Sequence, residues 1–255
     1  FIEGGAKQNP LFVTLPKKTE NIDGLSDVRK AELSQQALNI IEAKILPQYG
    51  EMIALFEELL TISNHDAGIW RLPKGEEIYR SALRSNTSTN LTADEIHQIG
   101  LSEVARIELG MEDILVGQGL SEGSIVSRIR YLMELPEHNF PNTEEGRLQQ
   151  IAYLNEVNAQ VMANIADYFI TIPPQPLEIV RVPEYSQDSA PNGYYRPPAV
   201  DGSSPGRFYI NQKDTRENPR WTLPTLMYHE GAPGHHFQLS AAQLIENVPF
   251  LRNFS

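Results

Sequence analysis

The 255-residue chain carries a formal net charge of −12 with a sequence pI near 5.0. This balance argues against nucleic acid or an anionic membrane as the main partner, because both require a basic face. The chain has no cysteine, so disulfides, thiolate zinc ligands and cysteine nucleophiles are excluded, and any metal must be held by nitrogen and oxygen ligands. No apolar run approaches the roughly 20 residues that a membrane-spanning helix requires. The sequence does not determine the cellular compartment, because an exported protein whose signal peptide has been removed would show the same features.

The first two thirds of the chain show helical periodicity. Apolar residues recur at helical spacing between Asp23 and Leu60, and Pro47 divides this stretch into two helices. Thr92 and Glu95 form a capping box at the start of a further helix. Two more helices are expected, at about residues 124–132 and 143–169.

The pattern changes after residue 170. Prolines between Pro173 and Pro198 forbid long helices, while LEIVRV and RFYIN have the β-branched and aromatic content of short strands. Between them, SQDSAPNGYYRPPAVDGSSPG is predicted to be a loop, and loops of this length are more often functional than idle. Helical periodicity returns at TLPTLMYHE.

The segment MYHEGAPGHHFQ, from Met227 to Gln238, holds three of the six histidines next to a glutamate. A hydrolytic zinc site needs two neutral imidazoles, a third histidine or carboxylate ligand, and a nearby carboxylate that takes a proton from water. His229 and Glu230 supply an imidazole and a base at neighbouring positions. The position four residues after His229, which shares its face on a regular helix, is occupied by Pro233.

The second imidazole therefore depends on how the helix is distorted. On a straight helix His236 returns to the face of His229 but lies about 10.5 Å farther along the axis, and His235 faces away. A proline in a helix clashes with the carbonyl four residues back, and Gly234 makes an irregular turn easy. We therefore predict a bulge or break at GAPG, which could bring His235 back to the metal. The alternative is a set of solvated or hydrogen-bonded histidines at a helix kink.

Several strings resemble one known family. YHEGAPGHHFQ, DGSSPGRFYIN, GIWRLPKGEEIY and LTADEIHQIGLSEVARI resemble the bacterial proteins grouped as domain of unknown function family 885, over about residues 68–243. Members of that family resemble gluzincin metallopeptidases, a mostly helical class of zinc enzymes. The resemblance implies that His229 and His235 bind zinc and that Glu230 is the general base. It leaves His236 to support the ligands or to donate to the oxyanion.

The resemblance also implies that part of the site is missing. The family's downstream glutamate motif, similar to EGWA, does not occur before the chain ends at Ser255. We therefore expect a fragment, with the third zinc ligand beyond residue 255 in the remaining C-terminal part of the same protein. Glu246, the only acid after the histidine cluster, lies too close along the same helix to fold back. The fragment is expected to bind zinc weakly or not at all and to be inactive.

The resemblance suggests where a substrate binds. In gluzincin-like enzymes the strand before the zinc helix often pairs with the peptide, and here this strand corresponds to RFYIN. We expect its backbone at residues 208–211 to bind the peptide and Tyr209 or Asn211 to orient the scissile amide, unless it is an ordinary edge strand. Tyr195 could polarise an oxyanion, line the pocket, or simply pack.

Together these observations predict a mainly α protein with a small β-sheet (α+β) and a gluzincin-like architecture that is incomplete at the C-terminus. Residues 1–170 form a helical region, and residues 171–255 form the β element, long loop and metal-site helix of one larger catalytic domain. The expected function is zinc-dependent hydrolysis of a peptide or small amide. The alternatives are a non-catalytic helical envelope or scaffold protein and a non-haem iron enzyme with two histidines and a carboxylate. The resemblance favours export to the bacterial cell envelope, including as a lipoprotein.

Overall fold

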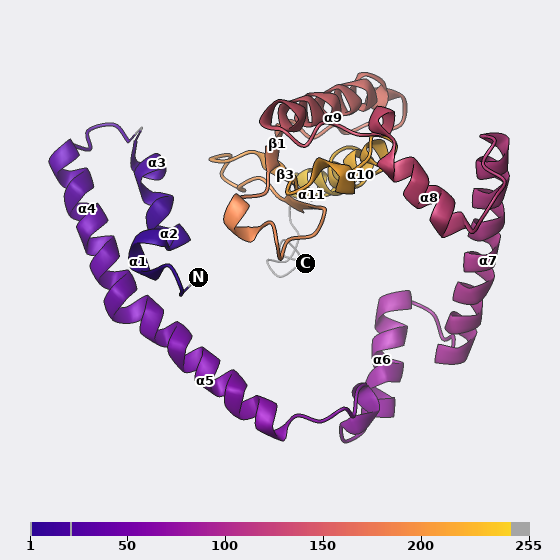
Figure 1. Cartoon of the computed structure of the whole chain (residues 1–255), viewed down its shortest axis with the longest axis horizontal. Helices are drawn as coiled ribbons and strands as arrows, with labels where there is room; N and C mark the ends of the chain where they lie inside the picture. The colour runs from indigo at the N-terminus through magenta and orange to yellow at the C-terminus, as the bar shows by residue number, and fades with distance from the viewer. Residues whose placement is uncertain (1, 21, 246–255) are drawn as a thin grey trace. The chain divides into compact units, whose positions relative to one another are not determined.

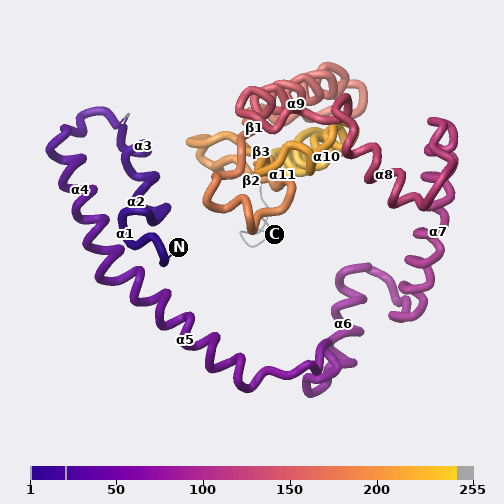
Figure 2. Tube along the Cα trace, in the orientation of Figure 1, coloured from indigo at the N-terminus to yellow at the C-terminus, as the bar shows by residue number. Residues whose placement is uncertain are grey.

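The computed structural model describes residues 2–20 and 22–245, so Glu246 lies outside the described part. The chain divides into two compact units, Phe1–Ser102 and Glu103–Ser255. The order of the elements along the chain can be followed in Figures 1 and 2. Among the described helices, none combines the length and the apolar character needed to cross a bilayer.

The first unit consists of helices. Pro47 stands in the first turn of α5, where a missing backbone N–H costs nothing, and a π-helical segment, Ile41–Ile45, separates α5 from α4. The expected division is thus a local change to π-helical hydrogen bonding and not a break, because Ile40, Ile41, Ile45 and Leu46 all stay in the right-handed helical region. The helices of this unit are α1 (Gly5–Gln8), α2 (Pro10–Val13), α3 (Leu15–Thr19), α4 (Asp27–Ile40), α5 (Leu46–Ile62) and α6 (Gly75–Thr87), with a 3-10 turn at Ile69–Arg71.

Helix α7 (Ala93–Gly117) runs across the division between the units. The capping box is confirmed at its start, because the Thr92 backbone N–H donates to a Glu95 carboxylate oxygen (2.8 Å) and the Glu95 N–H donates to the Thr92 hydroxyl (3.3 Å). Several of its apolar side chains are exposed. Val104 and Ile107 are about half exposed, whereas Leu115 is buried.

The second unit contains the remaining helices and a three-stranded sheet. Ser124 caps α8 and Thr143 caps α9, each accepting a hydrogen bond from a backbone N–H three residues later. The helices are α8 (Ile125–Glu134), α9 (Glu144–Asn164), α10 (Leu223–Glu230) and α11 (His235–Ala242), with 3-10 turns at Pro136–His138, Ile165–Asp167, Glu184–Ser186 and Thr215–Glu217. The strands are β1 (Leu177–Arg181), β2 (Gly193–Arg196) and β3 (Gly206–Ile210).

Strand β3 lies in the centre of the sheet, in the order β1-β3-β2. It pairs with β1 in parallel and with β2 in antiparallel orientation, so that Phe208 is opposite both Ile179 and Tyr195. The mainly α fold with a small sheet is therefore confirmed. The prediction of an uninterrupted loop between the two expected strands is wrong, because its GYYR stretch forms β2.

The core of this unit lies between one face of the sheet and helices α9 and α10. Alternate residues of β3, Phe208 and Ile210, are fully buried, as the two-residue period of a strand requires. They pack with Leu154 of α9 and with Leu223 and Met227 of α10. Because α9 contacts both β1 and α10, it belongs with the histidine helix. The second compact unit, Glu103–Ser255, therefore holds α9 together with the sheet and the histidine segment.

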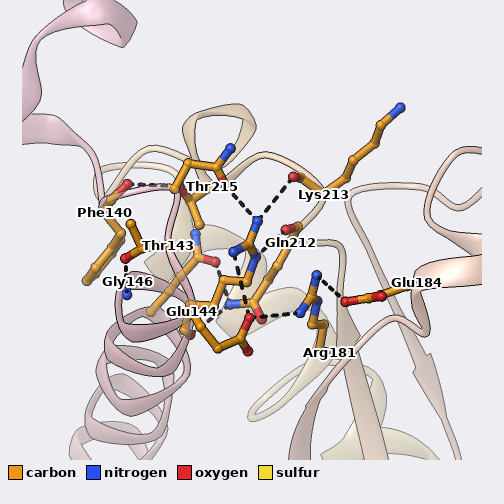
Figure 3. A network of polar contacts seen from close by, with 12 residues as sticks. Phe140, Thr143, Glu144, Gly146, Arg181, Glu184, Gln212, Lys213 and Thr215 are labelled. Carbon is orange, nitrogen blue, oxygen red and sulfur yellow. Dashed lines mark hydrogen bonds and ion pairs between the residues drawn. The ribbon is translucent and has the colours of Figure 1, made fainter.

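A polar network at the start of α9 fixes the segment that leads into α10. The Arg147 guanidinium donates to the Gln212 carbonyl (2.9 Å), and the Gln212 side chain donates to the Arg147 carbonyl (2.9 Å). The Thr215 hydroxyl donates to the Phe140 carbonyl (2.8 Å), and Arg181 pairs with Glu144 (3.2 Å) (Figure 3). These bonds hold residues 212–215 against the helix start and thereby set the position of α10.

Candidate metal and catalytic site

The histidine segment forms two helices separated by a break. Helix α10 ends at Glu230, and α11 begins at His235. The Gly231 N–H still donates to the Met227 carbonyl (2.7 Å), and the Gln238 N–H donates to the Gly234 carbonyl (2.9 Å), so each helix keeps its own terminal hydrogen bond. The intervening Ala232–Pro233 peptide bond is cis. The break that Pro233 predicts is therefore confirmed.

The two glycines of the break allow the chain to fold back closely on α10. A Cβ atom on Gly234 would lie 2.0 Å from the His229 carbonyl oxygen and 2.4 Å from that of Tyr228. On Gly231 it would lie 2.0 Å from the Met227 side chain. A larger residue at Gly234 would meet backbone atoms of α10 and push the chain away from them, whereas at Gly231 the nearest atom is the flexible end of the Met227 side chain.

This break brings two imidazoles together. The rings of His229 and His235 have centroids 4.6 Å apart and planes inclined at 85°. Two nitrogens bound to a tetrahedral zinc ion at about 2.0–2.1 Å lie roughly 3.3–3.4 Å apart, a separation that rings at this distance can provide. His229 is exposed and His235 is half-buried, so both rings border solvent.

Glu230 is buried directly beside this pair. Only 5% of the residue is exposed, and its Oε2 has no hydrogen-bond partner among the described residues. Burial raises the pKa of Glu230, and the neighbouring His235 and His229 oppose that rise. A buried carboxylate oxygen without a partner is costly unless water or a cation satisfies it. The residues present therefore fit a metal site with an adjacent base.

The donor set is nevertheless smaller than a closed zinc site requires. Within residues 2–20 and 22–245, no group of three or more His, Cys, Asp or Glu side chains is placed so that it could hold a metal ion. The described residues thus offer two imidazoles and one flanking carboxylate.

His236 does not point to the same place as His229 and His235. It is buried, its Nδ1 lies 2.9 Å from the Tyr195 hydroxyl, and its Nε2 lies 3.0 Å from the Gln175 carbonyl oxygen. Burial lowers the pKa of His236, and the hydrogen bond to Gln175 opposes this change. Both ring nitrogens are thus engaged, and the expected role of His236, as a support for the ligands or as a donor to an oxyanion, stays a prediction.

Tyr195 is brought to the site from β2. Its ring lies nearly parallel to that of His235, with centroids 6.4 Å apart, and edge-on to that of His236. Burial raises the pKa of the Tyr195 phenol to about 12, a rise that the Ser240 hydroxyl opposes. Gly206 makes room for this pair, because a Cβ there would lie 2.5 Å from the Tyr195 oxygen and 2.6 Å from His236 Nδ1. The only signal of this role in the sequence is a glycine at the start of a strand, which did not by itself predict it.

The other two expected substrate residues lie away from the site. Tyr209 stacks on Tyr194, with centroids 4.7 Å apart, on the face of the sheet opposite to Phe208 and Tyr195. The buried Asn211 side chain donates to the Gln187 and Ala190 carbonyls. Both side chains are thus engaged in contacts elsewhere in the fold, and their expected substrate-orienting roles stay predictions.

Strand β3 was expected to pair with a peptide substrate, but its position in the sheet does not allow this. Both edges of this strand are already hydrogen-bonded, to β1 and to β2. Its backbone at residues 208–211 therefore has no free edge for a substrate, and the alternative of an edge strand is also wrong.

A cavity lies beside His229, and neither His235 nor Glu230 is among its lining residues. Its volume is about 510 Å³, and its lining combines an aromatic ring, an aliphatic side chain and polar groups. It is lined by Asn192, Glu217, Asn218, Trp221, Thr222, Thr225, Leu226 and His229.

The fold and the site together define a mainly α protein with a small sheet, in which a broken helix carries two facing histidines and a buried glutamate. The chain belongs to the family of bacterial proteins of unknown function DUF885, whose model matches residues 1–255. The fold is similar to the crystal structure of the putative lipoprotein from Colwellia psychrerythraea, with a TM-score of 0.94 and 36% sequence identity. That match covers 100% of this chain and 44% of the solved one, so this chain spans less than half of that protein's length. A search of curated proteins gives no match.

Proposed function

We propose that this chain supplies two metal ligands and the general base of a zinc-dependent, gluzincin-like peptidase. The observation that carries the proposal is the placement of the His229 and His235 rings, 4.6 Å apart, next to a buried Glu230 with an unpartnered oxygen. Neither the family description nor the name of the Colwellia protein specifies an activity. The geometry of the site therefore has to carry the proposal.

Each residue has a distinct role in this proposal. His229 and His235 hold the ion through neutral ring nitrogens. Zinc, when bound, acidifies a coordinated water and polarises the substrate carbonyl. Glu230 takes the proton from the attacking water and returns it to the leaving amine. A carboxylate positioned beside the metal-bound water is a usual general base for such a step.

The third ligand is proposed to come from a part of the polypeptide outside the described residues. The described part contributes no third ligand, and the chain corresponds to only 44% of the solved relative. Metal affinity depends on the complete set of deprotonated ligands. The chain of 255 residues alone is accordingly proposed to bind zinc weakly and to lack turnover.

The substrate is proposed to be a peptide or small amide that enters the cavity beside His229. An envelope location for the protein is proposed from the description of its relative as a putative lipoprotein. The net charge of −12 fits neither nucleic acid nor an anionic surface as the main partner.

The proposal is tested with Glu230→Gln in a longer protein that includes the third ligand. Bound zinc, measured by mass spectrometry of the metal, is expected to be retained, while hydrolysis of a peptide library falls by at least about 100-fold. Glu156→Gln, an exposed substitution on α9, is the matched control and should change neither quantity. Undiminished hydrolysis by Glu230→Gln contradicts the assigned base. If the wild type binds iron instead of zinc, the alternative of a non-haem iron enzyme with two histidines is favoured. If it binds no metal, the alternative of a non-catalytic scaffold protein is favoured.

A further inference from the structure

The solvent-facing side of α10 forms a wall of the cavity beside His229. Trp221, Thr225 and His229 follow one another at four-residue intervals, and all three line this cavity. Residues four positions apart lie on the same face of a helix. The helical hydrogen bonds already begin at Thr222, because its carbonyl accepts from the Leu226 N–H (3.1 Å). A stripe of side chains thus leads from Trp221 to the proposed metal ligand.

Two asparagines in the rest of the lining are fixed by hydrogen bonds. The Asn211 N–H donates to the Asn192 carbonyl (2.9 Å), and the buried Asn218 side chain donates to the Asn211 carbonyl (3.2 Å). The Asn218 carbonyl in turn accepts from Gln150 of α9 (3.2 Å). The fold therefore shapes the cavity before any ligand enters. Its volume of about 510 Å³ falls within the range of roughly 300–1,000 Å³ that is usual for ligand pockets.

The side chains of the lining favour an apolar group. Trp221 is 45% exposed and Leu226 is half-buried, so an indole ring and an aliphatic side chain border the same space. The described residues that line the cavity include one acid, Glu217, and neither lysine nor arginine. An apolar group would remove the indole surface from water, and an aromatic ring would add a direct contact between rings. An acidic group would instead meet Glu217 with no cation in the lining to pair with it.

We propose that this cavity binds an aromatic side chain of the substrate peptide and that Trp221 is the residue that selects it. The inference rests on the proposed function, because His229 connects the cavity to the proposed metal site. Eight positions at about 1.5 Å each separate Trp221 from His229 by roughly 12 Å along the helix axis. An extended peptide covers this distance with about four residues. The selected side chain therefore lies within about four positions of the scissile bond.

Binding to the cavity can be measured without metal and without turnover. The longer protein is labelled with 5-fluorotryptophan, stripped of metal with a chelator and studied by ¹⁹F NMR. The signals of Trp221 and Trp70 are assigned by their loss in Trp221→Phe and Trp70→Phe.

The probe is an alanine peptide, blocked at both ends, in which phenylalanine replaces each residue in turn. At one position, phenylalanine should shift the Trp221 signal saturably and leave the signal of Trp70, which belongs to the first unit, unchanged. Aspartate at the same position should give no shift. If no peptide shifts the Trp221 signal saturably, or if aspartate acts as well as phenylalanine, the proposal is overturned.

The consequence for specificity is measured as kcat/KM in the longer, active protein. At the selected position of a cleaved peptide, phenylalanine should be preferred over alanine, and Trp221→Ala should reduce this preference by about 3- to 10-fold. Trp70→Ala, which removes an exposed aromatic ring outside the cavity, is the matched control and should keep the preference of the wild type.

Two outcomes of the kinetic experiment separate this inference from the proposed function. An equal fall of kcat/KM for both peptides in Trp221→Ala would indicate a structural role alone and would contradict the selection. Absence of hydrolysis in every form would overturn the proposed function, while the ¹⁹F titration would still decide whether the cavity binds an aromatic side chain.

Discussion

The imidazole rings of His229 and His235 lie edge to face across a four-residue helix break, with centroids 4.6 Å apart and planes at 85°. Six positions separate them along the chain, a spacing that would keep their rings apart on a straight helix. The break thus creates the pair, and its glycines make the break possible because no side chain fits against the end of α10.

Replacing the second of these glycines should damage the site. In Gly234→Ala the new methyl group would lie 2.0 Å from the His229 carbonyl oxygen, so α11 must shift and carry His235 away. We expect a loss of stability of about 1–3 kcal/mol and, in the longer protein, a loss of zinc affinity of about 10- to 100-fold. Denaturant unfolding and competition with a chelator measure the two effects.

Gly110→Ala is the matched control for this substitution. Gly110 lies inside α7, and a Cβ there meets nothing within 4 Å among the described atoms. It should stabilise the protein by about 0.5–1 kcal/mol, because alanine favours the helix over glycine. If Gly234→Ala behaves like Gly110→Ala, the close approach at the break has no structural role.

The ion pair between Glu112 and Arg128 should make the second unit sensitive to acid. Its Arg128 side chain is 5% exposed and also donates to the Leu120 carbonyl (2.8 Å), so the pair fastens α8 to α7. The hydrogen bond from Arg128 lowers the pKa of Glu112 below its ordinary value of 4.5. A lowered pKa in the folded state means that the stabilisation is complete above the ordinary value and is lost as the pH falls through the lowered one.

Urea unfolding as a function of pH tests this pair. Glu112→Gln should flatten the acid side of the stability profile and destabilise the protein at neutral pH, because it leaves a buried guanidinium without its anionic partner. Glu103→Gln, which removes an exposed pair with Arg106 within α7, should have little effect. Identical profiles for Glu112→Gln and the wild type would show that the pair does not contribute.

A buried pair of glutamines should stabilise the segment that leads into α10. The Gln150 side chain accepts from Gln212 (2.8 Å) and donates to the Asn218 carbonyl (3.2 Å), and both glutamines are fully buried. Gln150→Ala leaves these partners unsatisfied and should cost about 1–3 kcal/mol in the free energy of unfolding. Gln149→Ala, at the exposed neighbouring position, should change it by less than about 0.5 kcal/mol. Equal effects of the two substitutions would refute this role.

The sequence predicted those features that depend on local backbone chemistry. Pro47 predicts the division between α4 and α5, because a proline is tolerated only in the first helical turn. Thr92 and Glu95 predict a helix start through their reciprocal hydrogen bonds. Pro233 predicts the break after α10 in the same way.

Features that depend on contacts between distant segments could not be predicted. The short strand β2 lies in a stretch rich in Gly, Ser and Pro, and only its pairing with β3 makes it a strand. That pairing places β3 in the centre of the sheet and directs Tyr209 away from the site. His236 likewise finds its partners 41 and 61 positions away along the chain, in Tyr195 and Gln175.

The most direct test of the account is the zinc content of the longer protein and of two glutamine variants at adjacent histidines. The wild type and His236→Gln should each retain about one zinc per chain after dialysis, because His236 binds the backbone and Tyr195. His235→Gln should lose the metal, because it removes one of the two facing imidazoles. Full zinc occupancy in His235→Gln, or loss of zinc in a folded His236→Gln, would contradict the account.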